Sequence, residues 1–204
     1  LNSVYDVSNP LYEWFFCTPL NPTSLLYKKC ILYGYKDILE WLYDRGFNLE
    51  WSDWMTRMCV ENGHLNIIEW ICSKKDVINN NIWDDEWYTR LAAKNGHLEI
   101  LDWANKNHLL ETRKWDEWII RAVATNGHLN VLQWAYDNKF INNRQIWSEW
   151  IIRSVAKNNQ VEVLEWAYTN LLINRSVWNE WITRIVVEKK FLKVLQWADG
   201  KGYV

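Results

Sequence analysis

Five segments of the chain share one pattern of apolar and polar positions, which returns about every 31–33 residues. Each segment opens on a tryptophan, followed by polar residues and a second tryptophan. An apolar stretch, a polar turn and a second apolar stretch that ends in a third tryptophan complete it. The copies start at Trp51, Trp83, Trp115, Trp147 and Trp178. Self-similarity at this period is typical of stacked arrays, in which each unit buries its apolar face against its neighbours.

The copy at 115–146 shows how one unit is predicted to fold. Asp116 is a residue type that caps helix N-termini, and the acid after it suits the helix dipole, so a first helix starts there. Gly127 ends that helix, because glycine readily adopts the left-handed conformation that follows many helices. A second helix runs from Leu129 to about Asn138. The expected unit is therefore helix, tight turn, helix and connecting loop.

The repeat divides a single predicted domain, 1–204, into units. The full repeats are 51–82, 83–114, 115–146 and 147–177. A degenerate repeat at 21–50 precedes them, and residues 1–20 form an N-terminal cap. A C-terminal capping repeat, 178–204, carries extra lysines that suit a unit facing water. We therefore predict an all-α solenoid of helix-turn-helix repeats.

Composition narrows the classes of partner. The formal net charge is −2, whereas proteins that bind nucleic acid mainly through phosphates usually carry a basic excess. No apolar stretch is long enough to span a membrane, so no membrane partner is expected. The four cysteines lack the spacing of metal ligands or redox pairs, and we interpret them as small buried side chains in a reducing compartment.

Three histidines recur at one repeat position, but their spacing argues against a metal site. Stacking would separate His64, His97 and His128 by about 8–10 Å, the distance between packed helices. Ligands of one zinc ion must each lie about 2.0–2.1 Å from it. We therefore expect each histidine to form a structural hydrogen bond near the turn between the two helices.

An acid precedes one arginine by four residues in every copy, so the two side chains share a helix face. Such a pair contributes about 0.2–0.5 kcal/mol in isolation. The recurrence favours a ladder between repeats over a set of anion receptors. No Ser/His/Asp set, phosphate-binding loop or dinucleotide motif stands out, so we expect no enzyme, no cofactor and no metal. The pairs are Asp53–Arg57, Glu86–Arg90, Glu117–Arg121, Glu149–Arg153 and Glu180–Arg184.

The segment from Ala92 to Ala104, with Asn-Gly-His-Leu at its centre, resembles the ankyrin repeat. Its period, its helix–turn–helix order and its Gly-His pair all match. Where ankyrin repeats usually have Thr-Pro-Leu-His, this chain has sequences such as Trp-Ile-Ile-Arg at 118–121. The richness in tryptophan, asparagine and isoleucine is similar to ankyrin-like arrays of giant DNA viruses of amoebae.

This resemblance implies a protein–protein interaction scaffold, in the host cytoplasm or associated with the virion, whose partner is a host or viral protein. One subclass hands host proteins to a ubiquitin ligase. A structural component of a virion is the first alternative, and a single-stranded nucleic-acid binder is the second.

In ankyrin-like stacks, finger loops and the exposed side of the first helix line a concave groove, and we place partner binding there. Arginine is enriched at interaction hot spots, and a row of three arginines should project from successive fingers, with a lysine beside the first. Lys94 and Lys157, near the ends of two first helices, are the rival candidates. The predicted finger residues are Arg113, Lys114, Arg144 and Arg175.

Overall fold

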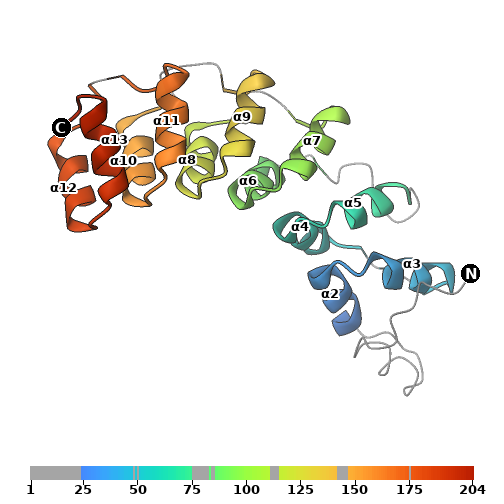
Figure 1. The fold of residues 1–204 in the computed structure, drawn as a ribbon. Coiled ribbons are helices and arrows are strands. Elements are labelled where there is room, and N and C mark those ends of the chain that lie inside the picture. The colour runs from blue at the N-terminus through green and yellow to red at the C-terminus, as the bar shows by residue number, and fades with distance from the viewer. Residues whose placement is uncertain are drawn as a thin grey trace, which may run out of the picture.

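Paired helices build the described part of the chain in the computed structural model (Figure 1). The structure describes residues 24–47, 49, 51–74, 83, 86–110, 115–141, 147–174 and 176–204. Twelve helices and no strand occur within these ranges, which confirms the predicted all-α class. The predicted N-terminal cap, 1–20, lies outside the described residues.

Each pair consists of a first helix, a tight turn and a second helix. The first helices are α2 (Ser24–Tyr33), α4 (Asp53–Asn62), α6 (Glu86–Asn95), α8 (Glu117–Thr125), α10 (Glu149–Lys157) and α12 (Glu180–Glu188). The second helices are α3 (Lys36–Asp44), α5 (Leu65–Cys72), α7 (Leu98–Lys106), α9 (Leu129–Asp137), α11 (Val161–Thr169) and α13 (Leu192–Gly200).

First helices pack on first helices, and second helices on second helices, along an elongated stack. Fully buried side chains such as Ile119, Val123 and Leu132 form one continuous core between the layers. The stack bends, and Figure 1 shows the first helices along the inner side of the bend. The first helices therefore line the concave face of the molecule.

Local signals act where the pattern predicted them. Ser52, Asp116, Ser148 and Asn179 hold the extended backbone of an N-cap. The side chains of Asp116 and Asn179 accept a hydrogen bond at 3.0 Å from the backbone N–H three residues later. This bond satisfies one of the donors that a helix start leaves without a partner.

Glycine and histidine of successive repeats interlock at the turns. Gly96 has φ +77°, and a Cβ on it would lie 2.5 Å from Nδ1 of His128 in the next repeat. Nε2 of His128 in turn lies 3.0 Å from the carbonyl oxygen of Lys94, to which it donates a hydrogen bond. Gly34 with His64, and Gly63 with His97, repeat the arrangement. The predicted structural role of these three histidines is confirmed.

The interlock changes at the C-terminal repeats. Gln160 takes the histidine position and packs over Gly127. Asn159 takes the glycine position at the next turn, with φ +59°. In the repeat after it, the histidine position is taken by Phe191. At the turns between paired helices, glycine therefore occurs where a histidine or glutamine from the following repeat approaches the backbone.

Candidate functional site

The three tryptophans of each repeat have different environments. The first is buried in the four later copies, and in the fourth repeat Trp147 is only 2% exposed. The second is exposed in all five copies, from 36% at Trp54 to 56% at Trp150. We call these second residues the tryptophan row. Its members are Trp54, Trp87, Trp118, Trp150 and Trp181.

Helical periodicity explains this exposure. In α8 the side chains of Ile119, Ile120, Val123 and Ala124 are buried and mark the core stripe. Trp118 precedes that stripe by one residue, which turns it about 100° away from the first core position. The first helices therefore hold their second tryptophan outside the core by register. This register could have been read from the sequence, because it depends only on helical periodicity.

Basic side chains lie over the rings of the row and come mostly from the preceding repeat. The guanidinium carbon of Arg57 lies 5.1 Å from the ring centroid of Trp87, and that of Arg90 lies 5.4 Å from Trp118. Lys28 occupies the same place over Trp54 at 5.5 Å. A cation over an indole face is attracted by the ring quadrupole, by about 0.5–1 kcal/mol at exposed sites.

Arg153 makes a double contact in this arrangement. Its guanidinium carbon lies 3.7 Å from the ring centroid of Trp150 on its own helix and 4.4 Å from that of Trp181 on the next. Indole and guanidinium groups thus join neighbouring repeats along the concave face, except between the third and fourth repeats, where the described residues show no such contact.

The predicted ladder of arginines is confirmed as a contact between repeats for Arg57, Arg90 and Arg153, but its main partner differs from the expected acid. Arg90 does pair with Glu86 four residues earlier, and it also bonds Asp116 of the next repeat at 2.7 Å. Arg184 instead pairs forward with Glu188 at 3.0 Å. Indole rings therefore replace carboxylates as the more regular partner.

Arg121 stands apart from the other four arginines at this position. Within the described residues it has neither an ion pair nor an indole partner, and its side chain is half-buried. The acid that holds Arg90 is the cap residue Asp116, and the equivalent cap one repeat later is Ser148. The hydroxyl of Ser148 donates to Glu117 instead.

Only two of the predicted partner-binding residues can be placed. Lys94 and Lys157 are exposed in the last turns of α6 and α10. Each follows a member of the tryptophan row by seven residues, which brings it to the same side of its helix. The four finger residues lie outside the described part of the chain; they are Arg113, Lys114, Arg144 and Arg175.

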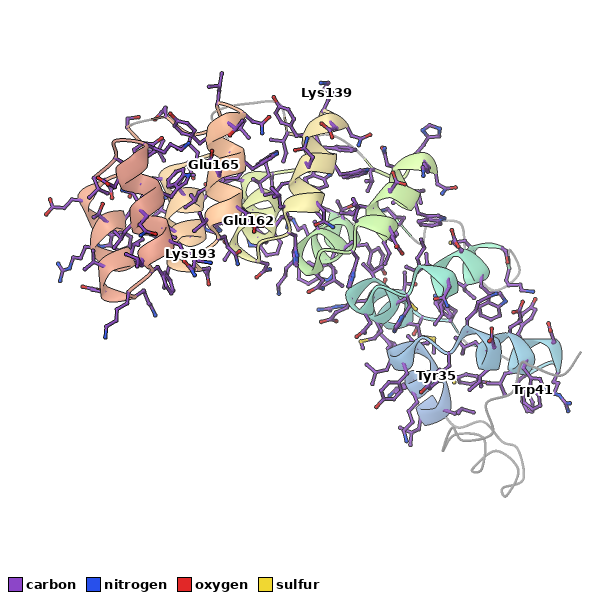
Figure 2. All side chains as sticks on the ribbon, viewed as in Figure 1. Tyr35, Trp41, Lys139, Glu162, Glu165 and Lys193 are labelled. Carbon is purple, nitrogen blue, oxygen red and sulfur yellow. The ribbon has the colours of Figure 1, made fainter. Side chains whose placement is uncertain are left out.

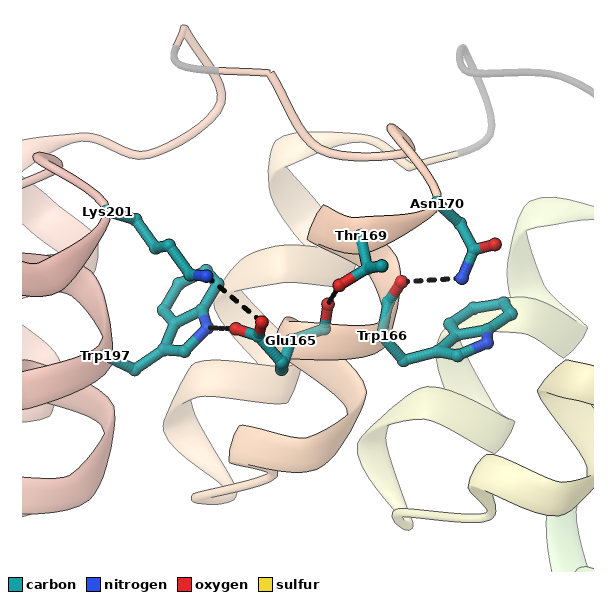
Figure 3. A network of polar contacts seen from close by, with 6 residues as sticks. All are labelled: Glu165, Trp166, Thr169, Asn170, Trp197 and Lys201. Carbon is teal, nitrogen blue, oxygen red and sulfur yellow. Dashed lines mark hydrogen bonds and ion pairs between the residues drawn. The ribbon is translucent and has the colours of Figure 1, made fainter.

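The second helices carry a different ladder on the outer face, in which the third tryptophan donates to the preceding repeat. Nε1 of Trp134 donates to Asp102 at 3.2 Å, and Nε1 of Trp197 donates to Glu165 at 2.6 Å. Lys201 also contacts Glu165, at 3.0 Å (Figure 3). The ammonium of Lys201 and then the Trp197 N–H hold the pKa of Glu165 below its usual value.

An open groove of about 660 Å³ lies beside this network. Glu162 and Glu165 of α11, labelled in Figure 2, border it together with Trp166 and Trp197. The polar groups of Glu165 and Trp197 are already bonded to each other. Two of the polar side chains that border this groove are therefore already satisfied.

Other candidate chemistry is weak in the described residues. Cys30 and Cys59 are buried, and burial raises the pKa of each thiol to about 12, so neither is a ready nucleophile. The expectation of burial is wrong for Cys72, which is exposed. No group of three His, Cys, Asp or Glu side chains in these ranges could hold a metal ion. None of the described helices has the length and apolar character needed to cross a membrane.

No protein-family model matches the chain, and no curated protein or solved structure is found to be similar to it. What the molecule can bind is therefore inferred from its own surface. The feature of that surface with the most distinctive chemistry is the tryptophan row.

Proposed function

We propose that the chain is a non-catalytic protein–protein interaction scaffold that binds its partner through the tryptophan row. The observation that supports this is the exposure of a tryptophan at one position in five successive repeats. Tryptophan and arginine are the residues most enriched at binding hot spots, and here they alternate along one concave face. Isolated apolar surface residues are ordinary, whereas a contiguous row is typical of an interaction site.

The contacts between repeats also prepare the row for binding. A cation from the preceding repeat lies over Trp54, Trp87 and Trp118, and this contact restricts the rotamers of those rings. Side chains that are ordered before association lose less conformational entropy when the partner docks. A preorganised surface of this kind suits specific recognition.

We further propose that the stack is ankyrin-like. Paired helices, left-handed glycines at the turns and first helices on the concave side are consistent with that resemblance. If the similarity to giant-virus arrays extends to function, the partner is a host protein or a virion protein. Delivery of host proteins to a ubiquitin ligase would belong to the same class of function.

Single-stranded nucleic acid is a second candidate ligand of the tryptophan row, because bases stack on aromatic side chains. Two features weigh against it. An acid directly precedes every member of the row, and cations already occupy ring faces that bases would need. Binding that falls steeply with added salt and saturates with oligo-dT would favour this candidate.

The test is quantitative capture from amoebal lysate with Trp87→Ala/Trp118→Ala. Loss of two hot-spot indoles is expected to reduce capture of specific partners by tenfold or more, since one such truncation costs about 2 kcal/mol. Leu171→Ala is the matched control, because Leu171 is 64% exposed and lies outside the row. Circular dichroism checks that both variants keep their helices.

The finger loops provide the competing outcome. If Arg113→Ala/Arg144→Ala/Arg175→Ala abolishes capture while the double tryptophan variant retains it, partner binding belongs to the fingers. If neither variant changes any captured protein, the scaffold proposal itself is wrong.

A further inference from the structure

The centre of the concave face contains an arginine, Arg121, that has no ion pair or indole partner among the described residues. Arg57, Arg90 and Arg153 each lie over the tryptophan of the following repeat. The equivalent ring for Arg121 is Trp150, and no such contact exists in the described structure. Arg153 lies 3.7 Å from the centroid of that ring instead.

The cap acid that would pair with this arginine from the next repeat is replaced by serine. Asp116 caps α8 and bonds Arg90 at 2.7 Å, so one carboxylate serves both the helix start and the neighbouring repeat. Ser148 caps α10 with a neutral hydroxyl and makes no side-chain cap bond. A half-buried guanidinium with no ion pair among the described residues favours an anionic ligand, because charge-assisted bonds are about twice as strong as neutral ones.

Along the concave face, basic side chains lie near Arg121 and acidic ones lie at the two ends of the tryptophan row. The position seven residues after each tryptophan is acidic at both ends of the row, Glu61 and Glu188, and is basic or neutral in the three central repeats. Lys94 and Lys157 flank the repeat of Arg121 on either side. The first-turn acids Glu117 and Glu149 also border it, and Glu117 already accepts the Ser148 hydroxyl. The central cations are those of Lys94, Arg121, Arg153 and Lys157.

We infer that Arg121, Trp118 and Trp150 form the anchor site for an acidic peptide segment of the partner. A partner carboxylate binds the Arg121 guanidinium, and an adjacent apolar side chain packs on Trp150, the most exposed ring of the row. Lys94 and Lys157 attract further acids of the segment at longer range. The inference rests on the proposed scaffold function and specifies the chemistry of its ligand.

Selection from a displayed library of random dodecapeptides tests the inference, followed by fluorescence anisotropy with the synthesised binders. Binders rich in Asp and Glu are expected. Arg121→Gln should weaken them by about tenfold or more, as expected for a bond to a charged group. Arg184→Gln is the matched control, because Arg184 holds the same repeat position but is paired with Glu188. It should change affinity by less than about twofold.

Ser148→Asp separates binding from folding. The new carboxylate reproduces the Asp116 arrangement, so it should cap α10, pair with Arg121 and raise the melting temperature. The same carboxylate should compete with the peptide and weaken it by about tenfold. A variant that is more stable yet binds less cannot have lost binding through unfolding.

Other outcomes overturn the inference in distinguishable ways. Binders without acidic enrichment, binders insensitive to Arg121→Gln, or no binders at all contradict the acidic anchor. If such non-acidic binders are still lost in Trp87→Ala/Trp118→Ala, the tryptophan row remains the binding surface and only the ligand chemistry was wrong. If oligo-dT binds and depends on Arg121 while peptides do not, both the acidic anchor and the scaffold proposal fail.

Discussion

At the residue scale, the turn glycines are determined by a contact with the next repeat as much as by their own backbone. A positive φ tolerates asparagine and even lysine, as Asn159 and Lys190 demonstrate. The space above Gly34, Gly63 and Gly96 tolerates neither, because a histidine ring fills it. The residue at one turn is therefore coupled to a residue about thirty positions later.

Gly96→Ala measures this coupling. It should destabilise the chain by about 1 kcal/mol from backbone strain and by a further 1–3 kcal/mol, roughly, from overpacking against His128. Gly46→Ala is the control, since Gly46 has a similar φ of +79° and a Cβ added there would meet no atom within 4 Å. Urea unfolding followed by circular dichroism gives both values. Equal losses for the two variants would show that the histidine ring yields without cost.

At the element scale, the sequence allowed the helix pairs and their ends to be predicted, because caps and turns are local. Asp116 and Gly127 each act within one turn of the backbone that they terminate. Contacts between repeats were harder to predict from the sequence. The i,i+4 spacing suggested carboxylate partners for every arginine, but whether Arg153 meets an acid or an indole depends on how neighbouring helices pack.

The outer ladder gives the last helix pair a dependence on pH. The pKa of Glu165 is lowered in the folded chain by Lys201 and Trp197, so its carboxylate contributes stability above its unfolded pKa of about 4.3. That contribution is lost as the pH falls through the lowered folded pKa. Glu165→Gln should therefore reduce the melting temperature at pH 6 by about 1–3 °C, and the difference should shrink below about pH 4.

Glu162→Gln serves as the control for this pH effect, because Glu162 lies on the same helix and has no ion pair in the described structure. Thermal scans by circular dichroism between acidic and neutral pH compare the two variants. A constant difference between Glu165→Gln and the wild type at every pH would mean that the lost contact is steric rather than ionic.

At the scale of the whole molecule, stacking makes the described part of the chain elongated, since each pair of helices packs mainly on its neighbours. A compact chain of this length would have a radius of gyration of about 17 Å. Small-angle scattering should give a clearly larger value and an asymmetric distance distribution. A value near that of a compact sphere would contradict the stacked arrangement.

The glycine–histidine interlock also limits how such an array can lengthen. A tandem duplication of 83–114 places His97 of the second copy over Gly96 of the first, and the two surfaces fit. A duplication of 147–177 places Gln160 of the second copy over Asn159 of the first, and a Cβ at the equivalent position, Gly127, would clash with the Gln160 side chain. Tandem duplication is therefore compatible with the packing of the earlier repeats but not with that of the fourth repeat. The array can lengthen at its N-terminal side more readily than at its C-terminal side.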